Sequence, residues 1–196
     1  MKASRKADHL PILAHATRGA WAAWLHQHHS ASQGVWLRLA KKGCPLELIN
    51  HREALEEALC HGWIDGQLRP ESETTWLVKF TPRREKSIWS KINRAKALAL
   101  IESGRMKAAG LREVERAKAD GRWDAAYDSQ STATAPPDFQ RALNRNARAK
   151  AFFGTLDSAN RYAVLWRIQT AKKPETRARR IKEFVAMLAR RQKLHP

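Results

Sequence analysis

Hydrophobic residues recur at helical spacing in two early segments, which lie on either side of one strand-like segment. The first helical segment follows Thr17, a residue type that caps helices, and Pro11 predicts that residues 1–16 form an irregular lead-in. In residues 34–40, Val35, Leu37 and Leu39 would lie on one face and Trp36 and Arg38 on the other, and this alternation predicts a strand. In 51–61 the helical pattern returns. It follows Asn50, a residue type that caps helices, and Glu53 lies three residues further on, as in a capping box.

Two further strand-like segments, 63–68 and 74–80, are separated by a Pro-Glu-Ser-Glu turn. Because the connection is short, we expect the two strands to form an antiparallel hairpin. A hairpin centred near residues 71–72 pairs the following residues across the strands: Trp63 with Phe80, and Asp65 with Val78.

From residue 88 onward the pattern is helical. Ser87 is a candidate N-cap for a helix over 88–103, and a shorter helix is predicted over 111–119. The segment 129–137 is small, polar and Pro-terminated, which is typical of a linker. Beyond it the pattern predicts further helices with starts near the following residues: Asp138, Asn146, Ser158 and Pro174.

These elements predict an α+β fold with a small antiparallel sheet of about three strands, packed by helices and followed by a mainly helical C-terminal half. The predicted domain organisation is an α+β core domain over 17–128, a linker over 129–137 and a basic helical module over 138–196.

Positive charge is concentrated near the C-terminus. The whole chain has a formal net charge of +18, and residues 129–196 contain 15 Lys and Arg against 4 Asp and Glu. Such an excess is typical of proteins with an anionic partner, which could be nucleic acid, an anionic membrane surface or an acidic protein. The alternative is that the charge only keeps a helical protein soluble.

The composition predicts neither a disulfide framework nor a membrane span. The two cysteines, Cys44 and Cys60, lie in different contexts, and no apolar run is long enough to cross a bilayer. We therefore expect a cytoplasmic protein. His26, His28 and His29 are clustered, but they point in different directions on a helix and lack acidic or thiolate company, so no metal or other cofactor is expected.

The most concentrated candidate site follows the predicted hairpin. Arg83 and Arg84 precede a predicted helix start at Ser87, and guanidinium groups beside free helical N–H groups favour phosphate or carboxylate. The candidate ligand- and anion-binding residues are Trp63, Asp65, Arg83, Arg84, Ser87, Trp89, Ser90 and Asn93. The alternative is internal: an arginine of this corner pairs with Asp65 or Glu85 and fixes the hairpin to the helix.

Two other groupings have a chemical and a structural interpretation. Cys60, His61 and Asp65 contain the three groups of a nucleophile triad, but neighbouring helical residues point about 100° apart, which favours a structural cysteine. The tryptophans of this region would line an aromatic groove or simply fill a core: Trp63, Trp76, Trp89 and Trp123.

The last predicted helix supplies a possible partner-binding face. Its basic residues are Lys172, Lys173, Arg177, Arg179 and Arg180. They would contact a phosphate backbone or an acidic protein, or they form a solvated helix face. No helix-turn-helix, zinc-finger, nucleotide-binding or hydrolase motif accompanies them.

Several short motifs together resemble one family of bacterial proteins, the YdeI/OmpD-associated, bacteriocin-protection family. They are ALCHGWIDG at 58–66, FTPRR at 80–84, SIWSKIN at 87–93, GRM at 104–106, GRW at 121–123 and AKKPETRARRI at 171–181. The similarity runs from about Trp21 to Leu188, and it departs at His61, where the family would carry an aromatic or apolar residue.

The resemblance implies a role in surviving bacteriocins or cationic peptides and an association with outer-membrane porin physiology. It supplies no catalytic residues. We therefore expect a non-enzymatic protection protein that binds an anionic partner or small ligand. The alternatives are a nucleic-acid-binding protein that uses the basic last helix, and an enzyme with a pocket where Trp63 and Asp65 meet Arg83 and Arg84.

Overall fold

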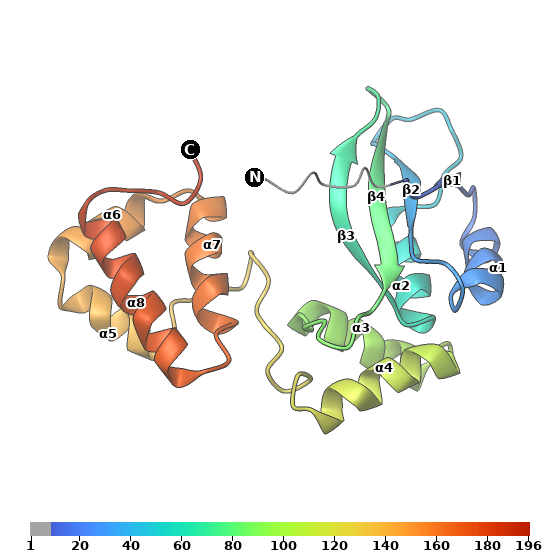
Figure 1. Cartoon of the computed structure of the whole chain (residues 1–196). Coiled ribbons are helices and arrows are strands. Elements are labelled where there is room, and N and C mark those ends of the chain that lie inside the picture. Colours follow the sequence, from blue (N-terminus) through green and yellow to red (C-terminus); the bar gives the residue numbers. More distant parts are fainter. Residues whose placement is uncertain (1–8) are drawn as a thin grey trace. The chain divides into compact units, whose positions relative to one another are not determined.

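The computed structural model describes residues 9–196 (Figure 1). Internal contacts divide the chain into two compact units. The N-terminal unit runs to Ser87 and resumes at Asn93–Trp123, and the C-terminal unit contains Ile88–Ile92 and Asp124–Pro196. The domain boundaries expected from the sequence remain a prediction.

The N-terminal unit contains a four-stranded mixed sheet. Its strands are β1 (Ile12–Ala14), β2 (Val35–Ala40), β3 (Trp63–Pro70) and β4 (Thr75–Pro82), in the order β1-β2-β4-β3. β1 pairs parallel to β2, and the other neighbours are antiparallel. The predicted strand count is therefore wrong, and so is the predicted irregular lead-in at Ile12–Ala14, because these three residues become a strand only by pairing with β2. Residues 1–8 of that lead-in lie outside the described residues.

The β3–β4 hairpin exists, but its expected register is wrong by two residues. Trp63 pairs with Pro82 and Asp65 with Phe80, and a bulge between Asp65 and Leu68 shifts the pairing again. Pro70 is the last residue of β3 rather than the start of the turn. A proline is tolerated there because β3 is an edge strand, where a missing N–H leaves no ladder bond unmade.

Two helices pack on one face of the sheet. α1 (Arg18–His28) begins behind Thr17, whose side chain accepts a hydrogen bond from the Ala20 N–H, as predicted. α2 (His51–Cys60) begins behind Asn50, whose Oδ1 accepts from the Glu53 N–H at 3.0 Å. Trp21 of α1 is fully buried, and its Nε1 donates to the Ala54 carbonyl of α2 at 3.1 Å.

Two further helices follow the sheet. α3 (Lys91–Glu102) starts three residues later than predicted, so Ser87 is not its N-cap. Ser87 Oγ instead accepts a hydrogen bond from the Arg84 N–H at 2.9 Å. α4 (Ala108–Ala119) also begins earlier than the predicted 111–119.

α4 approaches α2 through a glycine. A Cβ placed on Gly110 would lie 2.3 Å from Met106 Sδ and 2.6 Å from the carbonyl oxygens of Leu59 and Cys60. Backbone oxygens cannot give way as a flexible side chain can, so only glycine fits this helix–helix contact.

We expect Gly110→Ala to lower the free energy of unfolding by about 1–3 kcal/mol, because α4 must move away from α2. The matched control is Gly154→Ala in α6, where a Cβ meets nothing within 4 Å. That change should stabilise by about 0.5–1 kcal/mol, since alanine favours the helix. Urea denaturation measures both, and equal effects of the two substitutions would refute the close contact.

The C-terminal unit is helical. It contains α5 (Pro137–Asn144), α6 (Ala147–Thr155), α7 (Ser158–Gln169) and α8 (Pro174–Ala189), grouped together in Figure 1. Its core is formed by buried aromatic and aliphatic side chains: Phe139, Leu143, Ala149, Phe153, Leu156, Val164, Leu165, Ile168, Phe184 and Leu188. The predicted α+β class with a helical C-terminal half is therefore confirmed.

Two sets of side-chain hydrogen bonds connect separate segments of this unit. Arg177 of α8 donates two hydrogen bonds to Asp138 of α5, at 2.6 and 2.9 Å, and these bonds hold the pKa of Asp138 below its ordinary value although burial opposes them. Asn160 of α7 is buried, and its Oδ1 accepts hydrogen bonds from the N–H groups of Leu194 and His195. These hydrogen bonds hold the segment after α8 against α7.

Within residues 9–196, no helix combines the length and the apolar character that crossing a bilayer requires.

Candidate functional site

The eight residues of the predicted anion corner are divided between the two units. Trp89 and Ser90 belong to the C-terminal unit, and the other six belong to the N-terminal unit. Trp63 and Trp89 are buried in cores, and Asn93, Ser87 and Ser90 are half-buried. Because α3 begins at Lys91, the corner at Arg83 and Arg84 is not followed directly by the free N–H groups of a helix.

The two arginines of this corner have different environments. Arg83 is only 6% exposed, and its backbone N–H donates to the Gly62 carbonyl at 2.9 Å. Arg84 is exposed. Asp65, which the sequence offered as one possible partner of an arginine in this corner, is half-buried, and its Oδ2 lies 3.0 Å from His51 Nε2. Arg84 is therefore the member of the pair whose guanidinium faces solvent.

Cys60, His61 and Asp65 are not joined as a triad. His61 Nδ1 lies 2.9 Å from the Glu57 carbonyl oxygen, whereas Asp65 contacts His51. Burial, and to a lesser degree the nearby Glu57 carboxylate, raises the pKa of the Cys60 thiol to about 11. A buried thiol that keeps its proton at neutral pH fits the structural interpretation.

The histidines near the end of α1 have local partners. His28 stacks on Trp24, with ring centroids 4.7 Å apart, and His29 Nδ1 lies 3.0 Å from the Leu25 carbonyl oxygen. In the part of the chain that the structure describes, no three His, Cys, Asp or Glu side chains form a group that could hold a metal ion.

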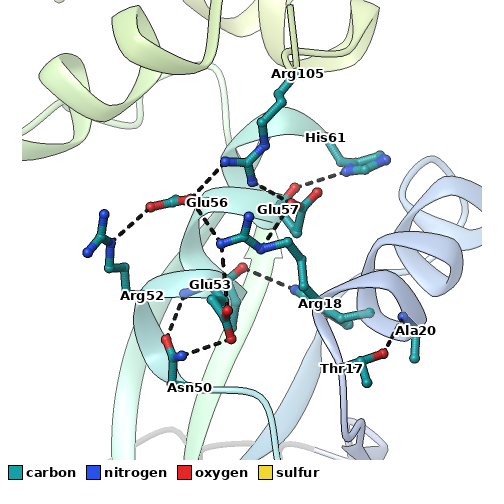
Figure 2. Close-up of polar contacts among 12 residues, drawn as sticks. Thr17, Arg18, Ala20, Asn50, Arg52, Glu53, Glu56, Glu57, His61 and Arg105 are labelled. Carbon is teal, nitrogen blue, oxygen red and sulfur yellow. Dashed lines mark hydrogen bonds and ion pairs between the residues drawn. The ribbon is translucent and has the colours of Figure 1, made fainter. Parts of the chain in front are cut away.

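A charged cluster on α2 brings together side chains from several elements of the N-terminal unit (Figure 2). Glu56 and Glu57 are 9% and 7% exposed, although both are ionisable. Arg105, from the loop before α4, donates to Glu56 Oε2 at 3.0 Å and to Glu57 Oε1 at 2.6 Å. Arg18 of α1 lies within 3.8 Å of the same two carboxylates.

The charges of this cluster balance one another, because Arg18 also lies 3.7 Å from Glu53, which makes three carboxylates against three guanidiniums. Burial alone would raise the pKa of Glu56, but hydrogen bonds from Arg105 and Arg52 hold it below its ordinary value. Arg105 is fixed between two carboxylates and Arg52 reaches Glu56 at 3.2 Å. The cluster therefore joins α1, α2 and the loop before α4, and we assign it a structural role.

The predicted basic face of α8 is partly engaged inside its own unit. Arg177 is bound to Asp138, Arg180 donates to the Arg167 carbonyl, and Arg179 lies 3.8 Å from Glu183. Lys172 and Lys173 are exposed before the helix. This face offers fewer unneutralised cations than the sequence suggests.

A cavity of about 930 Å³ lies between α6 and the end of α8. Its cationic lining consists of Arg148 from α6 and Arg190 and Arg191 from the end of α8. Its apolar lining includes Phe152, which is half-buried. Among residues 9–196, no Asp or Glu lines this cavity, which we call the α6–α8 cavity.

The backbone at the end of α8 positions one of these arginines. Arg191 has a φ of +56°, and it is the one non-glycine residue with positive φ in residues 9–196. The Arg191 and Gln192 N–H groups donate to the carbonyls of Leu188 and Met187, which is the Schellman arrangement. Glycine normally occupies this left-handed position, because a side chain there costs about 1–2 kcal/mol.

A second, smaller cavity of about 440 Å³ lies between α5 and the first half of α8. Arg141 and Arg145 line it, together with the engaged pair of Asp138 and Arg177. Among the described residues, Arg141, Arg145 and Arg148 have no side-chain ion pair. The end of α5, its C-cap residue and the first turn of α6 therefore present three unneutralised guanidiniums.

The sequence pointed to cations in this half of the chain but not to these residues. Arg148 and Arg190 are far apart in the sequence and are separated by two helix–helix connections. Arg191 offered one usable signal: it stands where a helix-ending glycine would be expected after a hydrophobic helix face.

Comparisons with known proteins match the two ends of the chain to different families, and the gap between the matches contains the boundary between the two compact units near residue 123. Residues 13–113 match the family model described as Domain of unknown function (DUF8412). Residues 132–191 match the model described as Bacteriocin-protection, YdeI or OmpD-Associated. No curated protein and no solved structure matches the chain.

The second match confirms the resemblance seen in the sequence for residues 132–191, which contain the AKKPETRARRI motif and both cavities. The motifs between residues 58 and 106 lie instead within the first match, and GRW at 121–123 lies in neither. Since the first match covers just over half of the residues, the chain belongs to the DUF8412 family and carries a C-terminal segment of the bacteriocin-protection, YdeI or OmpD-associated type.

Proposed function

We propose that this protein acts in protection against bacteriocins or other cationic peptides by binding an anionic partner through its C-terminal unit, without catalysing a reaction. The observation that carries the proposal is the set of unneutralised arginines around α6: Arg141, Arg145, Arg148, Arg190 and Arg191. The family match of residues 132–191 supports the biological setting.

The acidic residues of this half of the chain support the same interpretation, because they are used elsewhere. Asp138 pairs with Arg177, Glu183 lies beside Arg179, and Asp157 caps α7. Glu175 lies in the first turn of α8, away from the helix end that lines the α6–α8 cavity. The arginines around α6 therefore keep their charge available to a partner.

The test is survival of bacteria that depend on this protein when they are challenged with a bacteriocin or a cationic peptide. Replacing Arg141, Arg145 and Arg148 together by glutamine should abolish most of the protection. The charge-matched control replaces three exposed cations of the N-terminal unit, Lys42, Lys86 and Arg112, by glutamine and should protect as the wild type does. Equal protection by both triple variants, at equal protein levels, would refute the proposal.

The corner at Arg84 provides a competing location for the anion. If the partner binds there, Arg84→Ala will lose protection while its melting temperature stays that of the wild type, because Arg84 is exposed. Full protection by this variant would make the corner irrelevant and leave the C-terminal unit as the site.

A further inference from the structure

We propose that the α6–α8 cavity is a binding site for single-stranded nucleic acid, in which the three arginines hold phosphates and Phe152 supports a base. This inference rests on the proposed function and names its partner. The residues that carry it are Arg148, Phe152, Arg190 and Arg191.

The cations of the cavity suit phosphate. All three are arginines, whose planar guanidinium binds phosphate oxygens through two parallel hydrogen bonds. Arg190 donates only to the neutral Gln192 side chain, at 3.2 Å, and no side-chain partner is described for Arg148 or Arg191. The carbonyls at the end of α8 do not need the arginines, because backbone N–H groups already bond to Leu188 and Met187.

The remaining lining suits a base. Phe152 is half-buried and lies on the same cavity as the arginines, beside alanines of α6 and α8. An aromatic ring next to arginines is the combination by which single strands are bound without sequence readout. The cavity of about 930 Å³ is far larger than one phosphate group requires.

The second cavity, between α5 and the first half of α8, favours a polymer over a small ligand. Arg141 and Arg145 line it and precede Arg148 by only a few residues. A single nucleotide would leave these cations unused, whereas a strand has further phosphates to offer. A duplex is disfavoured, because its bases are stacked inside and cannot reach Phe152.

The left-handed conformation of Arg191 supplies an independent argument. At this position glycine would fit without strain, yet the chain places a guanidinium there, on the wall of the cavity. Residues held in such conformations are found preferentially at ligand sites, where the strain is offset by function. Stability and binding should therefore respond to this residue in opposite directions.

The first experiment uses the full chain and a fluorescently labelled twelve-residue oligothymidylate in anisotropy titrations. Arg191→Gly should raise the melting temperature by about 4–8 °C and weaken binding at least threefold. Arg148→Gln with Arg190→Gln should weaken binding at least tenfold and reduce the slope of log K against log salt by about 1.4, at about 0.7 for each single-strand phosphate contact.

Matched controls separate the site from the general charge of the unit. Lys150→Gln with Lys182→Gln removes the same charge from exposed positions on α6 and α8 that do not line the cavity, and it should change affinity less than threefold. Phe152→Leu keeps apolar volume and should weaken binding about fivefold or more without changing the salt slope.

Three outcomes overturn the inference. One is absence of oligothymidylate binding, and another is equal loss in the site and control double variants. The third is tighter binding of polyglutamate than of oligothymidylate with the same dependence on Arg148 and Arg190. That last result would leave binding of an anionic partner standing and replace its class by an acidic peptide, whereas full protection by the Arg141, Arg145 and Arg148 triple variant would remove the proposed function itself.

Discussion

Trp21→Ala is expected to lower the free energy of unfolding of the N-terminal unit by about 4 kcal/mol, the usual loss for a large aromatic side chain removed from a core. Trp21 is fully buried, and its ring lies 5.3 Å from that of Trp24 and 5.7 Å from that of Phe80, by centroids. It joins α1 to the sheet, and its Nε1 joins α1 to α2 through the Ala54 carbonyl.

Urea denaturation followed by far-ultraviolet circular dichroism measures this loss, with the transition of the C-terminal unit as an internal reference. Trp21→Phe keeps most of the ring but removes the hydrogen bond to Ala54, so it should cost about 1–2 kcal/mol. It also keeps the prediction measurable if the alanine variant does not fold. A loss below about 1.5 kcal/mol for Trp21→Ala would show that α1 is not anchored by this residue.

Arg105→Met should destabilise the N-terminal unit by about 3 kcal/mol, because it leaves two buried carboxylates without their closest cation. Arg52→Met is the matched control, since Arg52 also pairs with Glu56 but its side chain is 81% exposed. An exposed ion pair contributes about 0.5 kcal/mol, so the control should be nearly neutral. Equal losses in the two variants, measured by urea denaturation, would contradict the structural role of the buried cluster.

The loss of stability caused by Arg105→Met should become smaller as the pH falls into the acidic range. The folded protein holds the pKa of Glu56 below its ordinary value of 4.5, so the unfolded chain takes up the proton first as pH falls. The stability that this carboxylate contributes is therefore complete above pH 4.5 and is lost as pH falls through the folded-state pKa. The difference between wild type and Arg105→Met should shrink in that acidic range, and a difference that grows there would oppose the assignment.

Local signals in the sequence predicted most helices well. Thr17, Asn50 and Asn146 each accept a hydrogen bond from an N–H in the first turn of the helix that they cap. Pro174 is the first residue of α8, as expected. These features depend on neighbours three residues away, so one segment of sequence contains all the information.

Features that depend on distant residues were not predictable in the same way. β1 is three residues long and is a strand only because β2 lies beside it. The hairpin register changes at the bulge after Asp65, and the sequence offers no count of bulged residues. The late start of α3 has the same origin, since Ser90 forms a parallel bridge with Tyr127 just before the helix. The Tyr127 N–H donates to the Trp89 carbonyl, and the Lys91 N–H donates to the Tyr127 carbonyl.

The same distinction between local signals and distant contacts applies to the charged residues of the candidate sites. Glu56 and Glu57 look like a solvated helix face until Arg105 and Arg18 are brought to them from other elements. The charge excess of residues 129–196 was evident, but it could not show that Arg177 is internally paired and Arg148 is not. Composition gives the total charge of a surface, whereas tertiary contacts decide which cations remain available.

The position of β4 in the sheet has a consequence for synthesis of the chain. β4 lies between β2 and β3, so neither of these strands has its antiparallel neighbour until Thr75–Pro82 has been made. The emerging N-terminal unit therefore exposes the hydrophobic faces of β2 and α2 until the ribosome has added the hairpin, and aggregation competes with folding in that interval.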